Sequence, residues 1–232
     1  MTLAEHLTEL RHRFLVMAIT ISVFAVLGFI FYSDLLKVLQ DPYCSAVPHH
    51  CKFLATNPLD GLNLRVKIAF FGGFLISSPV ILWQTWRFIT PGLKSRERRY
   101  IVPFVGSSLL FFSAGVVVAY FSFGHAIKFL KAIGGSTLIT EYNPNQYLTL
   151  FLLMMFIFGV TFLFPVVLVA LEMINVVTPK QLLRGWRYTV IAIVVVAAVF
   201  TPSGDPLSMC ALAVPLIVFY FAAIGVGKLL HK

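Results

Sequence analysis

The sequence predicts an all-α, polytopic membrane protein with six transmembrane helices and both termini on the cytoplasmic side. Of the 232 residues, 59% are hydrophobic and only 12% are charged. A soluble domain carries about a quarter charged residues, so the bilayer is expected to be the main solvent of this chain. The 18 basic and 9 acidic residues give an excess of positive charge. The bases gather at the ends of apolar segments, which indicates membrane topology rather than nucleic-acid binding.

Residues 1–13 are predicted to form an amphipathic helix. Thr2 and Glu5 have the spacing of a capping box, in which each side chain satisfies a backbone N–H of the first turn. Leucines at helical spacing form a narrow apolar face, and Glu9 and His12 fall on the opposite face. We expect this helix to lie along the membrane interface before the chain turns into the first span.

Six apolar segments follow, and we expect all of them to belong to one transmembrane domain, 1–232. They cover roughly Phe14–Tyr32, Val66–Phe88, Tyr100–Phe123, Tyr147–Leu171, Tyr188–Phe200 and Leu207–Gly227. The expected connections are a first extracytoplasmic loop (33–65), a first cytoplasmic loop (89–99) and a second extracytoplasmic loop (124–146).

The fifth and sixth spans are expected to be short. The fifth apolar segment, Tyr188–Phe200, has 13 residues. As a helix it reaches about 20 Å, against a hydrocarbon core of about 30 Å. The bilayer thins there, protein buries the polar ends, or the last two segments form a re-entrant hairpin.

The distribution of basic residues predicts the orientation. Twelve of the 18 Lys and Arg residues fall on the side shared by the two termini, and six fall on the other side. Because cytoplasmic loops carry the excess of Lys and Arg, both termini are expected to be cytoplasmic.

No catalytic motif is present, so we expect no enzyme, no cofactor and no catalytic metal. The sequence contains no nucleotide-binding P-loop, no G-x-S-x-G and no H-E-x-x-H. The segment "CSAVPHHC" allows two interpretations: Cys44 and Cys51 form a disulfide, or they bind zinc with His49 and His50. The disulfide is favoured, because adjacent histidines rarely both reach one ion.

Two acids expected on the cytoplasmic side stand among bases. Glu97 lies in "GLKSRERRY", and Glu9 lies in the N-terminal segment. In the simplest interpretation Glu9 pairs with Arg13 one helical turn later and Glu97 pairs with its basic neighbours. Alternatively, the two carboxylates together receive a cationic ligand such as a guanidinium, which carboxylates bind in a bidentate geometry.

Charge is otherwise scarce inside the spans. Glu172 is expected at the cytoplasmic end of the fourth span, where its carboxylate reaches water easily. A carrier coupled to protons or ions normally buries a charge in the middle of a span. This argues against the alternative function, a secondary transporter of a small solute. A third hypothesis is a scaffold that only assembles other membrane proteins.

Four stretches, taken together, resemble the TatC family, the receptor and core subunit of the twin-arginine protein translocase. They are "EHLTELRHRFL", "SSPVILWQTWRFITPGLKSRERRY", "FGVTFLFPV" and "TPSGDP", and they occur in order over essentially the whole chain. The paired loop cysteines look most similar to those of actinobacterial members. The resemblance implies six spans, cytoplasmic termini and export of folded proteins driven by the proton-motive force.

The resemblance also implies partners and site residues. The partners are the twin-arginine signal peptides of folded cargo, TatA- and TatB-type single-span proteins, other copies of the chain and membrane lipid, without nucleic acid. The positions that match the signal-peptide site are Glu9, Glu97, His6, Leu10, Arg11, Phe88 and Pro91. Pro42 and Asp60 match functionally sensitive positions of the first extracytoplasmic loop.

Three positions depart from the pattern of the family in the region expected to dock the single-span partners. Leu163 stands where members commonly carry a glutamate, Met209 where many carry a glutamine, and Phe221 where an acid is often present. Asp205, in "TPSGDP", belongs to the same region. Glu172 is not expected to replace the missing acid, because nine residues are about 13.5 Å along a helix and half a turn around it.

Overall fold

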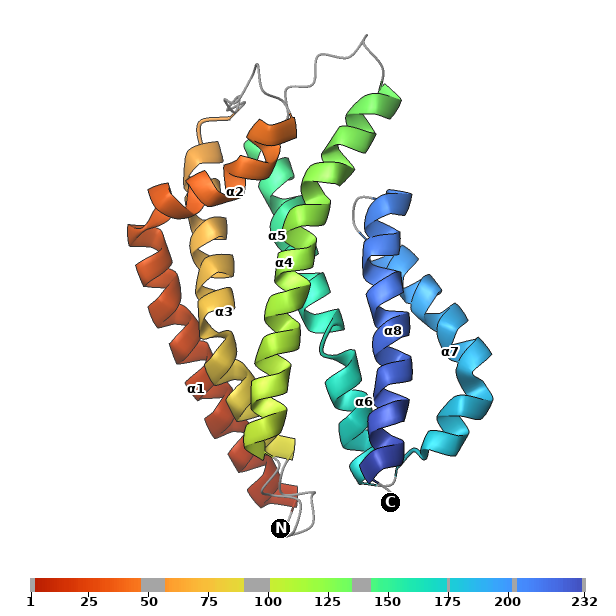
Figure 1. The fold of residues 1–232 in the computed structure, drawn as a ribbon. Coiled ribbons are helices and arrows are strands. Elements are labelled where there is room, and N and C mark those ends of the chain that lie inside the picture. Colours follow the sequence, from red (N-terminus) through yellow and green to blue (C-terminus); the bar gives the residue numbers. More distant parts are fainter. Residues whose placement is uncertain are drawn as a thin grey trace. The chain divides into compact units, whose positions relative to one another are not determined.

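The computed structural model is helical, without strands in the parts of the chain that it describes. These parts are residues 3–46, 57–89, 101–134, 143–174, 176–201 and 204–230. The helices, in chain order, are α1 (Leu3–Ile30), α2 (Tyr32–Ala46), α3 (Asp60–Ile89), α4 (Ile101–Gly134), α5 (Pro144–Thr161), α6 (Phe164–Met173), α7 (Pro179–Phe200) and α8 (Pro206–Leu230) (Figure 1).

Six helical stretches within the described ranges are long and apolar enough to cross a bilayer, which confirms the predicted fold class. They are Leu7–Ile30, Asp60–Phe88, Ile101–Ile133, Pro144–Met173, Pro179–Phe200 and Pro206–Leu229. The fourth stretch is interrupted between α5 and α6. Pro165 has no N–H to donate to the carbonyl of Thr161, so the regular helical hydrogen bonding stops there.

The first expected loop contains a helix that the sequence analysis missed. Residues 33–65 were expected to be a loop, but α2 occupies the first part of this range. The helix is amphipathic: Asp34 and Lys37 pair on its exposed side at 2.9 Å, and Tyr43 is buried. Because α2 is much less apolar than the spans, a search for continuous apolar segments does not find it.

The expectation of a 13-residue fifth span was wrong. The helix α7 has 22 residues and begins at Pro179, nine residues before the apolar segment. Thr178 accepts a hydrogen bond from the backbone N–H of Gln181, and Gln181 reciprocates, so a capping box begins the helix among polar residues. A 22-residue helix is about 33 Å long, against a hydrocarbon core of about 30 Å. It is still the shortest of the six spans.

The first span also begins earlier than expected. The sequence analysis placed a turn between an interfacial helix, residues 1–13, and the span that follows. In the structure the described part of that segment and the span form the single helix α1, 28 residues long. Its N-terminal residues are therefore held in line with the span, which fixes Glu9 relative to the neighbouring helix.

The chain groups into two compact units, each described here by itself. The first consists of residues 1–41, 52–109 and 142–148. In it α1 and α3 lie side by side (Figure 1). Their backbones approach closely at two glycines: a Cβ on Gly73 would lie 2.5 Å from the backbone N of Ala25, and one on Gly28 would lie 3.1 Å from the carbonyl O of Ala69. Small residues permit such approach between membrane helices.

The second unit consists of residues 42–51, 110–141 and 149–232. Its core is aromatic: the rings of Phe123 and Phe151 stack with centroids 4.4 Å apart. The hydroxyl of Tyr220 on α8, fully buried, donates to the carbonyl of Leu182 on α7 at 2.8 Å. This hydrogen bond joins α8 to α7, and α8 also packs against α6.

The expectation that Glu172 reaches water was wrong. Its side chain on α6 is fully buried and lies against Gly227 of α8. Gly227 has no side chain, and this absence leaves the space that the carboxylate occupies. The acid is therefore part of the α6–α8 contact.

We predict that Gly227→Ala destabilises the protein by about 1–3 kcal/mol, because the added methyl group overlaps the carboxylate of Glu172. Thermal unfolding in detergent measures the change. Gly225→Ala is the matched control, since a methyl group there meets no atom within 4 Å. Adding Glu172→Ala to the Gly227→Ala protein should recover most of the lost stability. Equal stability of Gly227→Ala and Gly225→Ala would contradict the contact between Gly227 and Glu172.

Candidate signal-peptide site

Three side chains of the first unit form a connected polar group at one end of α1 and α3. Arg13 donates to Oε1 of Glu9 through Nε, at 3.1 Å, and through Nη2. Its Nη1 donates to Oε1 of Gln84 on α3, at 3.2 Å. The i,i+4 pair that the spacing predicted is therefore present, and the arginine also links the two helices.

The pair is largely withdrawn from solvent. The side chain of Arg13 is 11% exposed and that of Glu9 is 24% exposed. A carboxylate in such a setting binds a guanidinium more strongly than a fully exposed one does, because water screens the charges less.

A polar pocket of about 190 Å³ adjoins this group. It is lined by Glu9, His12, Arg13, Gln84 and Arg87. The three α1 residues lie on one face because their spacing is three and four residues, and the two α3 residues are three apart. The pocket therefore follows from helical periodicity on both helices, and it offers one carboxylate, one imidazole, one amide and two guanidinium groups.

The other residues predicted for this site are distributed around it or lie outside the described residues. Leu10 and Arg11 are exposed on α1, and Phe88 is half-buried near the end of α3. His6 lies in α1, but its side chain is outside the described part of the chain. Pro91 and Glu97 are also outside it, so their position relative to Glu9 stays a prediction.

A buried contact that the sequence analysis missed ties together the two helices flanking residues 90–100. Trp86 of α3 donates from Nε1 to Oγ of Ser108 on α4 at 2.7 Å. Its ring also stacks on Phe104, with centroids 4.8 Å apart. Because Glu97 lies between these helices in sequence, this contact sets where its segment leaves α3 and enters α4. In the sequence Trp86 follows Trp83 by three residues, and this pattern did not indicate a buried contact with α4.

The two residues predicted to be sensitive in the first extracytoplasmic loop are both buried in helices. Asp60 begins α3, and its carboxylate accepts hydrogen bonds from the backbone N–H of Asn57 at 2.9 Å and from Nδ2 of Asn145 at 2.7 Å. Pro42 lies inside α2, and Tyr147, two residues after Asn145, donates to the carbonyl of Leu39 in the same helix at 3.2 Å. The start of α5 therefore fastens both α2 and α3.

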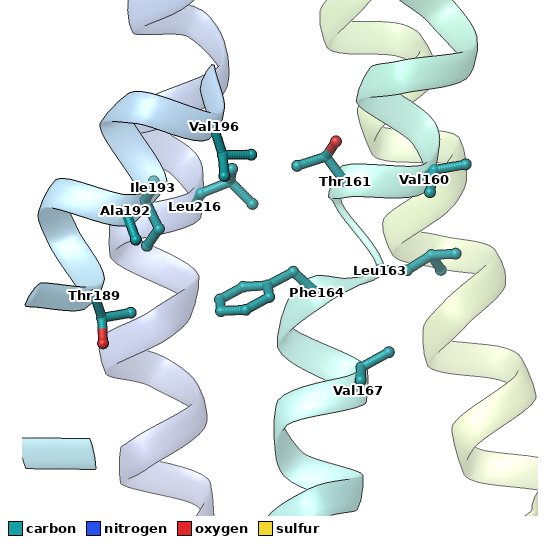
Figure 2. A pocket seen from close by; sticks show the side chains of 10 residues that line it. All are labelled: Val160, Thr161, Leu163, Phe164, Val167, Thr189, Ala192, Ile193, Val196 and Leu216. Atoms are coloured by element: carbon teal, nitrogen blue, oxygen red, sulfur yellow. The ribbon is translucent and has the colours of Figure 1, made fainter. Parts of the chain in front are cut away.

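The predicted partner-docking residues lie in the second unit. Leu163 lies at the interruption between α5 and α6, on an apolar cavity of about 450 Å³. Figure 2 shows Phe164 pointing from the start of α6 toward α7 and α8. The lining is Val160, Thr161, Leu163, Phe164, Val167, Thr189, Ala192, Ile193, Val196 and Leu216. The departure at Leu163 thus leaves the cavity without a charged side chain.

Asp205 and Met209 lie at the start of α8. Asp205 is 2% exposed, and its Oδ2 accepts a hydrogen bond from the backbone N–H of Ser208 at 2.6 Å, which caps the helix. Met209 is half-buried in the first turn. Phe221, the third departure, lies further along α8 with its ring 6.3 Å from that of Trp186.

The state of Cys44 agrees with the disulfide interpretation of the first extracytoplasmic segment. Cys44 is disulfide-bonded, and Cys210 is an exposed free thiol. Cys51, His49 and His50 lie outside the described residues, so the pairing with Cys51 stays a prediction. Within the described ranges no three His, Cys, Asp or Glu residues gather as they would around a metal ion.

Comparison with known proteins gives one consistent result. The family described as "Sec-independent protein translocase protein (TatC)" matches residues 5–215. The chain is 38% identical over 242 residues to the Sec-independent protein translocase protein TatC of Frankia casuarinae, covering 99% of this chain and 66% of that protein. It is 38% identical over 234 residues to the protein of the same name from Synechocystis sp., covering 100% of this chain and 90% of that one.

A solved structure agrees with these relatives. The crystal structure of a twin arginine translocase receptor, TatC, superposes with a TM-score of 0.79 at 33% identity, covering 98% of this chain and 100% of that chain. The agreement in sequence and in fold extends over nearly the whole chain. This chain belongs to the TatC family of Sec-independent protein translocase proteins.

Proposed function

We propose that the chain is the receptor for twin-arginine signal peptides, and that Glu9 and Glu97 bind the two arginines of the signal. The observation that carries the proposal is the Glu9 site, where the carboxylate accepts two N–H groups of a guanidinium beside a polar pocket. Carboxylates bind guanidinium groups through charge-assisted hydrogen bonds, and here two N–H groups converge on Oε1. The site is therefore suited in chemistry to a guanidinium group.

Glu97 is proposed as the second acid because of where its segment starts. Helix α3 ends at Ile89, five residues after Gln84, which is about 7.5 Å along the helix. This end of α3 lies beside the end of α1 that carries Glu9. Glu97 follows Ile89 by eight residues in the sequence, among four bases whose positive charge a carboxylate partly offsets.

The chain is a multi-pass component of a protein translocase in the inner membrane. We propose in addition that its termini are cytoplasmic and that it lacks catalytic activity. It assembles with TatA- and TatB-type single-span proteins, with further copies of itself and with membrane lipid. Export of folded cargo is driven by the proton-motive force. The names of the relatives do not favour the alternative of a small-solute transporter.

Partner docking is proposed in the second unit. The cavity at Leu163 faces α7 and α8 with an apolar lining, and the start of α8 places Asp205 and Met209 at the end of the same helix pair. A single-span partner helix would contact this region through apolar packing at Leu163 and polar contacts near Asp205.

Binding of a synthetic signal peptide to the purified protein tests the receptor assignment. We expect an Arg-Arg peptide to bind and a Lys-Lys peptide to bind much more weakly. Glu9→Gln and Glu97→Gln should each lower the affinity for the Arg-Arg peptide by about tenfold to a hundredfold, because a charge-assisted hydrogen bond contributes about 1.5–3 kcal/mol. Fluorescence anisotropy in detergent or nanodiscs measures the affinity.

Asp34→Asn is the control for removing a negative charge. Asp34 is a 69% exposed acid that pairs with Lys37 at the other end of the first unit's helices. Asp34→Asn should leave the affinity for the Arg-Arg peptide within twofold of wild type. Full Arg-Arg binding by folded Glu9→Gln and Glu97→Gln proteins would overturn the roles of the two acids, and a wild-type protein that does not prefer the Arg-Arg peptide would overturn the receptor function and favour a scaffold.

A further inference from the structure

In the proposed function the Glu9 carboxylate binds an arginine of the signal peptide. In the structure this carboxylate already accepts hydrogen bonds from Arg13. The guanidinium of Arg13 donates from Nε and from Nη2 to the same oxygen of Glu9, Oε1. An incoming arginine that binds this oxygen needs the same lone pairs. The two guanidinium groups therefore compete for one acceptor.

We propose that Arg13 is a built-in competitor of the signal peptide, whose guanidinium occupies the arginine position on Glu9 until a signal arginine displaces it. The inference rests on the proposed receptor function and deepens it. It makes Arg13 a residue that lowers the affinity of the site for every ligand, because a ligand binds Glu9 only by displacing the resident guanidinium.

The structure supplies a second acceptor for Arg13 when it leaves Glu9. Its Nη1 donates to Oε1 of Gln84 at 3.2 Å, across the helix pair. Gln84 is on α3, so this bond does not depend on Glu9. The adjoining pocket of about 190 Å³ gives the side chain room to move. A displaced Arg13 therefore keeps a hydrogen-bond partner, which lowers the free-energy cost of the exchange.

The exchange sets how tightly a signal binds. An incoming guanidinium can replace the contact of Arg13, in which Nε and Nη2 both donate to Oε1 of Glu9, with an equivalent one. An ammonium group is a compact point charge without the planar fork of a guanidinium, so lysine binds Glu9 less well than arginine does. Because every ligand must displace the same resident guanidinium, removing Arg13 should raise the affinity for both peptides by the same factor.

The test compares Arg-Arg and Lys-Lys peptides on the full-length protein in nanodiscs of neutral lipid. We expect Arg13→Gln to bind both the Arg-Arg and the Lys-Lys peptide about threefold to tenfold more tightly than wild type, by the same factor for each. Arg13→Lys should bind more tightly than wild type and less tightly than Arg13→Gln. If Arg13→Gln fails to fold, as judged by thermal unfolding, the Arg13→Lys comparison decides the same point.

Arg65→Gln is the matched control. It removes the same charge from an arginine of α3 that does not line the pocket and whose guanidinium lies over the rings of Phe29 and Tyr32. Its gain should stay below twofold and vanish at high salt, since it acts only through long-range electrostatics. A gain equal to that of Arg13→Gln, or an Arg13→Gln protein that binds no more tightly than wild type, overturns the inference.

The two proposals fail in different ways. A wild-type protein that binds both peptides equally overturns the receptor function, and this inference with it. A wild-type protein that prefers Arg-Arg, combined with an Arg13→Gln protein that keeps the same affinity for both peptides, overturns the competitor role alone.

Discussion

Gly73→Ala is expected to destabilise the first unit by about 1–3 kcal/mol or more. The added Cβ would lie 2.5 Å from the backbone N and 2.7 Å from the Cα of Ala25. Backbone atoms cannot rotate away as the end of a side chain can, so α1 and α3 must separate along their whole contact. The loss outweighs the gain in helix propensity of Ala over Gly, which is about 1 kcal/mol.

Gly106→Ala on α4 is the matched control. It makes the same change inside a helix, and its methyl group meets no atom within 4 Å. Denaturation in mixed micelles should show Gly106→Ala at or above the stability of wild type and Gly73→Ala clearly below it. Two alanine variants of equal stability would show that the α1–α3 contact is looser than the structure indicates.

The same substitution should weaken signal-peptide binding. Arg13 reaches Gln84 only because α1 and α3 lie in contact, and the pocket has walls from both helices. Separation of the helices lengthens this bridge and opens the pocket. The close approach at Gly73 thus connects packing inside the membrane with the chemistry at the helix ends.

The six spans could be predicted from sequence because continuous apolar length is a local property that the bilayer imposes. The ends of the helices could not. Helix α7 begins in polar sequence, where the capping box of Thr178 and Gln181 determines the first residue. Helix α2 is amphipathic and short, and nothing in its length or apolarity distinguishes it from a loop.

The candidate site was predictable only within one helix. The pairing of Glu9 with Arg13 follows from their spacing of four residues. The role of Gln84 depends on a contact between residues 71 apart in the sequence, which no local pattern reveals. The exposure of Glu172 was predicted wrongly for the same reason, because its burial is set by the absence of a side chain at Gly227 on another helix.

Trp86 should be the most sensitive aromatic residue near the Glu97 segment. It is 8% exposed, stacks on Phe104 and donates to Ser108, which is 1% exposed. Trp86→Ala is expected to cost about 3–5 kcal/mol through the cavity that it leaves. Trp86→Phe keeps a ring but loses the donor, and it should cost about 1–3 kcal/mol.

The role of the hydrogen bond is separable from that of the ring. Ser108→Ala removes the acceptor, so a double-mutant cycle with Trp86→Phe should be non-additive, the double variant losing less than the sum of the single losses. Trp83→Phe, three residues earlier on the same helix and 40% exposed, should change stability by less than about 0.5 kcal/mol.

Signal-peptide affinity gives the functional measurement for the same variants. Because Trp86 and Ser108 fix the ends of α3 and α4 from which residues 90–100 start, Trp86→Phe should weaken Arg-Arg binding through Glu97 while leaving the Glu9 contact in place. The loss should therefore disappear in a Glu97→Gln background. An equal loss in both backgrounds would show that Trp86 acts on the stability of the helices alone and does not position Glu97.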